Sequence, residues 1–304
     1  MNRPDFSEYG IESHWFGEPA AELRLLVVYA HPDDESFGNA GTIARYAAEG
    51  VDVHYACATR GECGTVAPGF LEGHADIGAL RTAELDCAAR ALGLRAVHYL
   101  GYRDSGMPGS PDNANPAALV QAPLRQVTGQ VVALIRALRP QVVLTFPPYG
   151  GYGHPDHIYI HQAVGPAFDA AADPVLYPEQ IAAGLSPWRP AKLYYSTLGT
   201  GFLRLSVAMM RLLRRDPRRF GENADVDLVR VVEEATPVTA VVACGAWTEQ
   251  MDRARLCHAS QLGGMAGLMR LPRPMRRLLM GREQFTRALP PSGRKRERDL
   301  FAGL

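Results

Sequence analysis

The stretch that decides the fold is residues 25–35, LLVVYAHPDDE, in which six apolar residues lead directly into one imidazole and three carboxylates. Six consecutive apolar residues have the length and composition of a buried strand. The polar side chains of His31, Asp33, Asp34 and Glu35 follow where a strand would turn into a helix. Like charges this close raise each other's pKa, so such a cluster is typical of a site where a cation or a proton transfer requires it.

A second strand end of the same kind lies far downstream. Residues 142–146, VVLTF, precede a glycine-rich segment and then His154, Asp156 and His157. In an open parallel sheet, ligands bind at the carboxyl ends of the strands, so two such ends can meet across one crevice. The sequence therefore predicts one metal site that both segments share.

Apolar runs of strand length alternate with helix-length stretches. We expect strands over residues 25–30, 51–58, 96–100 and 141–146, and helices over residues 36–49, 76–92, 118–138 and 158–172. This order predicts βαβ units, and therefore an α/β, Rossmann-like fold with a mostly parallel sheet flanked by helices. A dinucleotide cofactor is not expected, because the first turn has carboxylates instead of Gly-x-Gly-x-x-Gly and would repel a phosphate.

The periodic signal weakens after about residue 173, where prolines become frequent. We expect residues 1–175 to form a Rossmann-like catalytic core that carries both polar motifs. Residues 176–304 are predicted to belong to the same structural unit, with strands near residues 193–195 and 238–243. This C-terminal portion would complete the sheet and form part of the substrate pocket, since loops on a rigid scaffold often carry specificity.

The composition excludes some partners. The 304-residue chain has 32 basic and 32 acidic residues, so no overall field draws it toward nucleic acid or anionic membranes. No apolar run approaches the roughly 20 residues of a membrane-spanning helix, and the first residues do not resemble a signal peptide. We expect a cytoplasmic protein with no integral membrane segment and no nucleic-acid partner, and the oligomeric state is left open.

The five cysteines are odd in number, widely spaced and never arranged as Cys-x-x-Cys. Reduced thiols are the simplest interpretation of this pattern. Cys57 falls in an expected strand and Cys87 in an expected helix, so both are predicted to be small buried hydrophobic residues. Cys63 follows a strand end on the crevice side and is left open.

The two polar motifs resemble those of the PIG-L/LmbE family of metal-dependent N-deacetylases. The resemblance rests on AHPDDE at residues 30–35 and GYGHPDH at residues 151–157, in this order and each after an apolar strand. Within the family, residues 103–107 are similar to the mycothiol-pathway deacetylase, whereas residues 192–195 and 299–304 look more like the mycothiol conjugate amidase. The resemblance implies zinc-dependent hydrolysis of the N-acetyl amide of an N-acetylglucosamine-type conjugate, a small amino sugar, with release of acetate and free amine.

His31, Asp34 and His157 are the candidate metal ligands. Residues three apart near a helix start lie on one face, so His31 and Asp34 can reach the same ion while Asp33 points elsewhere. Three protein ligands and one open position are typical of catalytic zinc, and the family resemblance implies the same set. The ion is predicted to be Zn²⁺, with Fe²⁺ as the alternative, since two imidazoles and one carboxylate suit both.

Asp33 is the candidate general base, because a carboxylate beside a metal-activated water can take its proton during attack. It is also a suitable helix N-cap, and the two roles are compatible. Glu35 is expected to stabilise the helix N-terminus electrostatically. His161, four residues after His157, is expected to lie outside the ligand set, because no glutamate follows His157 as a zincin site would require.

The remaining site residues rest mainly on the resemblance. It implies that His154 stabilises the oxyanion or protonates the leaving amine, and a neighbouring carboxylate such as Asp156 would favour its imidazolium form. It also implies that Tyr152 polarises the carbonyl, with loop packing as the alternative. Asp104 would bind a sugar hydroxyl, with stabilisation of its own turn as the alternative, and Met107 would line the pocket.

Other functions stay open. One is an amidase of a mycothiol-like thiol conjugate, another a tailoring deacetylase of a glycosylated natural product, and a third a catalytically inactive, metal-holding binding module. Residues 62–74 contain no arginine and Gly38 replaces a serine, where the inositol-sugar deacetylases of the family have both. These departures weaken an inositol-sugar assignment. Residues 204–219, rich in arginine, are interpreted as an ordinary surface helix.

Overall fold

The computed structural model describes residues 3–18, 21–221, 224–293 and 295–304. Residues 1 and 2, part of the N-terminal segment that was not expected to be a signal peptide, lie outside the described residues. One eight-stranded sheet forms the centre of the molecule, in the order β1-β4-β3-β2-β5-β6-β8-β7. Its strands are β1 (Glu12–Trp15), β2 (Arg24–Tyr29), β3 (Asp52–Thr59), β4 (Ala96–Tyr102), β5 (Val142–Thr145), β6 (Lys192–Thr197), β7 (Ala240–Ala243) and β8 (Arg282–Leu289).

The five strands from β4 to β6 pair in parallel, and the three outer strands pair antiparallel. If the five parallel strands are numbered 1 to 5 in chain order, starting with β2, their order across the sheet is 3-2-1-4-5, as in a doubly wound sheet. The predicted Rossmann-like, mostly parallel fold is confirmed, and C-terminal strands do complete the sheet. A division of the chain near residue 175 stays a prediction.

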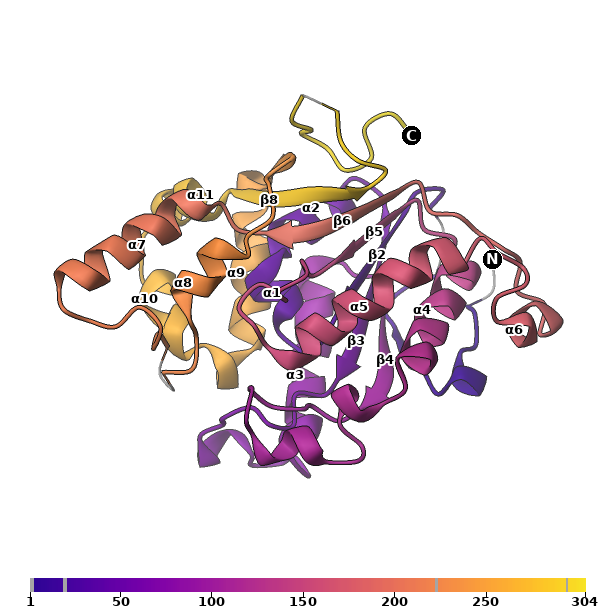
Figure 1. The fold of residues 1–304 in the computed structure, drawn as a ribbon, viewed down its shortest axis with the longest axis horizontal. Coiled ribbons are helices and arrows are strands. Elements are labelled where there is room, and N and C mark those ends of the chain that lie inside the picture. Colours follow the sequence, from indigo (N-terminus) through magenta and orange to yellow (C-terminus); the bar gives the residue numbers. More distant parts are fainter. Residues whose placement is uncertain (1–2, 19–20, 222–223, 294) are drawn as a thin grey trace.

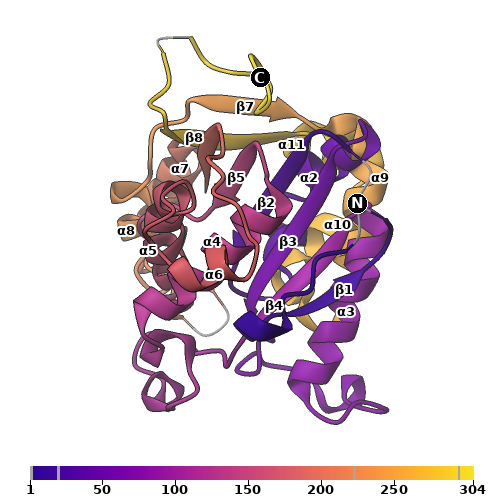
Figure 2. The ribbon, with the colours of Figure 1, turned by 90° about the vertical axis from the view of Figure 1, so that its right-hand side faces the viewer.

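Helices cover both faces of the sheet, as Figures 1 and 2 show, with α4 and α5 on one face and α3 and α9 on the other. The helices are α1 (Asp34–Gly38), α2 (Ala40–Ala48), α3 (Ile77–Leu92), α4 (Leu124–Leu138), α5 (Pro155–Ala170), α6 (Pro178–Ala182), α7 (Thr200–Leu212), α8 (Leu228–Glu233), α9 (Thr248–Cys257), α10 (Ala266–Met269) and α11 (Arg273–Met280). Strands β2 and β3 are almost completely buried between these layers, and residues 25–29 of β2 are accordingly all apolar.

Several expected boundaries were wrong for identifiable reasons. The helix expected over residues 36–49 is broken at Asn39, whose non-helical backbone separates α1 from α2. The helix expected from residue 118 begins only after Pro123, because proline disfavours helical geometry in the residue before it. Conversely, α5 begins at Pro155, three residues earlier than expected, since proline is favoured in the first helical position.

The cysteine prediction was wrong in one important respect. Cys87 and Cys257 form a disulfide between α3 and α9, 170 residues apart in sequence. Cys87 is exposed rather than buried. Cys57 is a fully buried free thiol, as predicted. Within the described residues, no helix is both long and apolar enough to cross a membrane.

Candidate active site

The two polar motifs meet at one place in the fold. His31 to Glu35 follow β2, and His154 to His157 follow β5, its parallel neighbour. Strand order along the chain reverses between β2 and β5, so a crevice opens at their carboxyl ends. The fold therefore brings together residues that are more than 120 positions apart.

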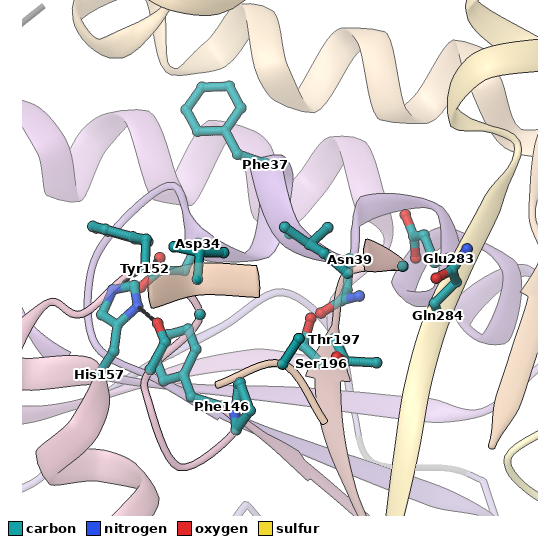
Figure 3. A pocket seen from close by; sticks show the side chains of 18 of the residues that line it. Asp34, Phe37, Asn39, Phe146, Tyr152, His157, Ser196, Thr197, Glu283 and Gln284 are labelled. Atoms are coloured by element: carbon teal, nitrogen blue, oxygen red, sulfur yellow. Dashed lines mark hydrogen bonds and ion pairs between the residues drawn. The ribbon is translucent and has the colours of Figure 1, made fainter. Parts of the chain in front are cut away.

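Three side chains that could bind a metal converge in this crevice. His31 Nδ1 lies 3.1 Å from His157 Nε2. Asp34 places Oδ1 3.3 Å from His157 Nε2 and Oδ2 3.5 Å from His31 Nδ1, and the first of these contacts is visible in Figure 3. Tetrahedral ligands bonded at the usual zinc distances stand about 3.3 Å apart. The three predicted ligands thus have the mutual spacing of a metal-binding set.

The protons on the two imidazoles also fit a cation. His157 Nδ1 contacts the carbonyl oxygen of Gly150 at 2.9 Å, which fixes the N–H on that atom in the neutral ring. His31 Nε2 lies 3.2 Å from Asp156 Oδ2, which fixes its N–H there. The two nitrogens that face each other then both carry lone pairs, beside the Asp34 carboxylate. In these neutral forms the lone pairs repel one another, and either a proton on His31 or a cation bound between the donors relieves the repulsion.

A second group of donor atoms lies on the other edge of the His31 ring. Four buried side chains have ligand atoms within 4.8 Å of one another there: His31, Asp104, His154 and Asp156. A further buried group with the same spacing consists of His31, His154 and His157. His31 Nε2 is 3.5 Å from Asp104 Oδ1, and Asp156 also accepts the backbone N–H of Ser105 at 3.0 Å. His31 therefore has possible ligands on both edges, although its Nε2 already has a carboxylate partner.

The charges around His31 and Asp34 stabilise each other. Burial lowers the pKa of His31, but Asp104, Asp156 and Asp34 outweigh it and hold the pKa well above its ordinary value. Burial likewise opposes ionisation of Asp34, yet the neighbouring His157 and His31 hold its pKa well below the usual range. The site thus keeps this carboxylate ionised, as a metal ligand must be.

Asp33 has an unusual backbone, with φ of 120°. A non-glycine residue in this region stores strain of order 1–3 kcal/mol, which is typical of functional sites. Its carboxylate accepts a hydrogen bond from Arg81 Nη2 at 2.9 Å, and burial raises its pKa to about 6 although Arg81 opposes the shift. Asp33 occupies the N-cap position of α1, but its side chain forms no capping hydrogen bond. The proposed capping role is therefore wrong.

His154 does not have the partner expected from the sequence. Its Nδ1 accepts the backbone N–H of Asp156 at 3.2 Å, while the carboxylate of Asp156 faces His31 instead. Burial, together with the nearby His31 and His157, lowers the pKa of His154 to about 2. The predicted imidazolium is wrong: the ring is neutral, with its proton on Nε2, 4.0 Å from Asp104 Oδ1.

Two cavities meet at this centre. A polar one of about 370 Å³ is lined by Asp104, Met107 and His154, and a larger one of about 820 Å³ by Asp34, His157 and residues of the C-terminal half. Tyr152 and Asp33 line both cavities. Figure 3 shows the larger cavity running from Tyr152 and His157 toward Glu283 and Gln284 on β8. The C-terminal portion therefore does contribute to the cavity wall.

Asp104 is more closely tied to the centre than expected. It is nearly fully buried, and its carboxylate accepts backbone N–H groups of Gly106 at 2.8 Å and Cys63 at 3.2 Å. Burial opposes ionisation, but His31 and the hydrogen bond from the Gly106 N–H hold the pKa of Asp104 well below its usual range. Asp104 therefore both stabilises its own loop and lines the polar cavity.

Two buried side chains that contact the motif were not predicted from the sequence. Arg81 on α3 donates to the carbonyl oxygens of Pro32 and Gly61 as well as to Asp33, and lines the polar cavity. His258, at the end of α9, contacts Glu35, which is completely buried. Glu35 therefore does more than stabilise a helix terminus. Both partners are distant in sequence, and neither belongs to a local motif.

Two other expectations concern residues outside the centre. His161 contacts the carbonyl oxygen of Phe146 at 2.9 Å and belongs to neither donor group, as predicted. Residues 204–219 form part of α7 and the loop after it and are largely exposed. The α7 face that carries Val207 packs on α8.

Comparison with known proteins agrees with this geometry. Residues 26–168 match the family model PIG-L, described as GlcNAc-PI de-N-acetylase. The 1D-myo-inositol 2-acetamido-2-deoxy-alpha-D-glucopyranoside deacetylase of Rhodococcus erythropolis is 40% identical over 303 residues, covering 94% of this chain and 99% of the relative. The chain belongs to the PIG-L family. The predictions of the family and of an enzyme of the deacetylase class are thereby confirmed.

Solved structures of low identity support the fold alone. A conserved protein of Thermus thermophilus has a TM-score of 0.56 at 24% identity and covers 89% of this chain and 97% of its own. The 4-carboxy-2-hydroxymuconate hydratase of Pseudomonas putida also has a TM-score of 0.56, at 18% identity, with 89% and 98% coverage. One fold thus carries both PIG-L family chemistry and a hydratase, so the reaction must be argued from the site.

Proposed function

We propose that this PIG-L family member hydrolyses the N-acetyl amide of a glucosamine-type conjugate with the help of a divalent metal ion, Zn²⁺ or Fe²⁺. The observation that carries the proposal is the convergence of His31 Nδ1, His157 Nε2 and the Asp34 carboxylate at 3.1 to 3.5 Å. The relative from Rhodococcus erythropolis, by its name, deacetylates an N-acetylglucosaminyl inositol.

His31, Asp34 and His157 are preferred as ligands over the donors on the other edge of His31. The preferred set brings one ionised carboxylate to two lone-pair nitrogens, whereas His31 Nε2 faces Asp156 as a donor. A carboxylate that accepts the distal N–H of a metal-bound histidine is a common feature of metal centres. Asp156 therefore orients His31, and Asp104 holds its own loop beside it.

A divalent ion held there would lower the pKa of a coordinated water to about 7 and polarise the amide carbonyl. Asp33 lies beside this position and, with a pKa of about 6, accepts a proton from the attacking water near neutral pH. The same carboxyl group can then return the proton to the departing nitrogen. Arg81 keeps the Asp33 carboxylate in one orientation through its 2.9 Å hydrogen bond.

His154 acts in this proposal as a neutral donor rather than as an imidazolium. Its Nδ1 is occupied by the Asp156 N–H, so Nε2–H is the free donor, and it faces the polar cavity beside Asp104. A preorganised N–H aimed at the developing oxyanion stabilises the transition state. Tyr152, which borders both cavities, is proposed as a second donor to the carbonyl oxygen, and Asp104 and Met107 as sugar contacts.

The missing arginine of residues 62–74 does not leave the polar cavity without a cation, since Arg81 lines it. This removes part of the argument against an inositol sugar. The larger cavity, about 820 Å³, favours a second candidate: an amide in a larger conjugate, cleaved by the same residues. Cavities of this size are typical of drug-sized ligands.

The test is a panel of N-acetylglucosaminides, including the inositol conjugate, and larger thiol and glycoside conjugates. Free amine and acetate are measured in parallel with the metal content of the same sample. Equimolar amine and acetate from one compound, lost on chelation and restored by Zn²⁺ or Fe²⁺, is the expected result. A metal-replete sample that releases neither product from any compound would contradict the proposal and favour a binding module.

A further inference from the structure

The buried pair of Glu35 and His258 is a feature that the proposed reaction does not use. His258 Nε2 lies 2.6 Å from Glu35 Oε1, and both side chains are fully buried. His258 Nδ1 has no hydrogen-bond partner among the described residues. Within that part of the chain, Glu35 is thus the only hydrogen-bonding partner of this ring. Burial of an ionisable pair costs desolvation free energy even when the two groups are hydrogen-bonded, so the pair is not explained by stability alone.

The other oxygen of Glu35 reaches the proposed base. Glu35 Oε2 accepts the backbone N–H of Asp33 at 3.0 Å, and Oε1 also accepts the hydroxyl of Ser36 at 2.6 Å. Asp33 is the residue with the strained φ of 120°. A carboxylate held by His258 therefore anchors the backbone of Asp33 at the point where its conformation is least favourable.

The rest of Asp33 is anchored from the same side of the molecule. Arg81 on α3 holds its carboxylate. The chain around His258 is in turn fixed to α3: Glu84 accepts the N–H and the hydroxyl of Ser260, both at 2.8 Å, and Cys257 is joined to Cys87. Helix α3 and the end of α9 are thus linked to each other, and together they hold the backbone and the carboxylate of Asp33.

We propose that His258, acting through Glu35, is a positioning residue for Asp33. This inference rests on the proposed function, in which Asp33 transfers the proton. His258 lines neither cavity, so it acts without touching the substrate. Its contribution is to keep the Asp33 carboxylate aligned with the attacking water. Misplacement of a catalytic group by about 1 Å can cost up to about 100-fold in rate.

The test compares two variants of His258 with a matched control. His258→Leu removes the donor and keeps apolar volume, whereas His258→Gln retains an N–H near the position of Nε2. His98→Leu is the control, because His98 is equally buried and hydrogen-bonded, to His54 and Ser13, but lies on β4 away from both cavities. All three are purified with their metal content measured.

His258→Leu is expected to lower kcat at least tenfold with KM and metal content unchanged, and His258→Gln to recover most of the loss. His98→Leu is expected to lower the melting temperature without lowering kcat. Equal kcat losses in His258→Leu and His98→Leu, or a His258→Leu enzyme with wild-type kcat, would overturn the inference. A loss that appears only in KM or in metal content would overturn it as well.

A crystal structure of His258→Leu separates this inference from the proposed function. Asp33 is expected to leave its positive φ and its carboxylate to separate from Arg81, while His31, Asp34 and His157 stay in place. This result would support positioning even if the wild-type protein had no deacetylase activity. An Asp33 that keeps the wild-type φ and the Arg81 hydrogen bond would contradict it.

Discussion

Buried histidines serve two different purposes in the two halves of this chain. At the ends of β2 and β5, His31 and His157 direct lone-pair nitrogens toward each other and toward Asp34. At the end of α9, His258 directs one ring nitrogen to Glu35, and its other nitrogen meets no partner in the described part of the chain. The first arrangement has the spacing of a cation site, whereas in the second a single proton between His258 and Glu35 satisfies the pair. The comparison teaches that the partners around each ring nitrogen, rather than the residue type, distinguish a candidate metal ligand from a histidine that positions a neighbouring side chain.

The largest effect on kcat is expected at Asp33, which lies next to the proposed metal ligands and is held by the Glu35–His258 pair. Asp33→Asn should reduce kcat by about 10³-fold, within the range for loss of a general base, because the amide cannot accept a proton. Metal content should be unchanged, since Asp33 is not a proposed ligand. Steady-state kinetics with metal analysis checks this. An Asp33→Asn enzyme with more than a tenth of wild-type kcat would show that another group is the base.

Removal of a proposed ligand should act on the metal itself. His157→Ala is expected to weaken metal binding at least 100-fold, because two ligands remain where three were arranged. Competition with a chromophoric chelator measures the affinity. The matched change His161→Ala, on the same helix, should leave affinity and kcat within about twofold, as expected away from the reacting groups. Equal losses in both variants would contradict the ligand assignment.

Much of this centre was predictable because its signals are local. His31, Asp33 and Asp34 directly follow one buried strand, and His157 follows another, so sequence order and sheet topology bring them together. The roles of Asp156 and Glu35 were not predictable, because tertiary packing turns the Asp156 carboxylate toward His31 and places His258 beside Glu35, and neither leaves a local signal. The β8 strand was also missed, since its sequence REQFTRAL lacks the alternation of a half-buried strand.

A pH profile sharpens the account of Asp33. Its pKa is raised to about 6, so the carboxyl group is protonated, and unable to accept a proton, at lower pH. The acid limb of kcat/KM should therefore fall about tenfold per pH unit below about pH 6 and level off above it. His154, with a pKa of about 2, should contribute no ionisation in this range. A flat profile from pH 4 to 7 would contradict the role of Asp33.

The disulfide offers a smaller effect on stability. It joins α3 to α9 across 170 residues, and cross-links of long loops typically stabilise by about 2–4 kcal/mol. Cys87→Ser with Cys257→Ser should lower the melting temperature by several degrees. Calorimetry with and without a reducing agent checks this, and a reductant should affect only the wild type. An unchanged melting temperature would mean that the packing of α3 against α9 suffices.

We propose above that His31, Asp34 and His157 bind one metal ion. Anomalous diffraction at the zinc absorption edge, from crystals of the zinc-loaded protein, tests it most directly. One strong peak is expected, about 2.0–2.2 Å from His31 Nδ1, His157 Nε2 and an Asp34 oxygen. A peak on the other edge of the His31 ring, between Asp104 and Asp156, would contradict it.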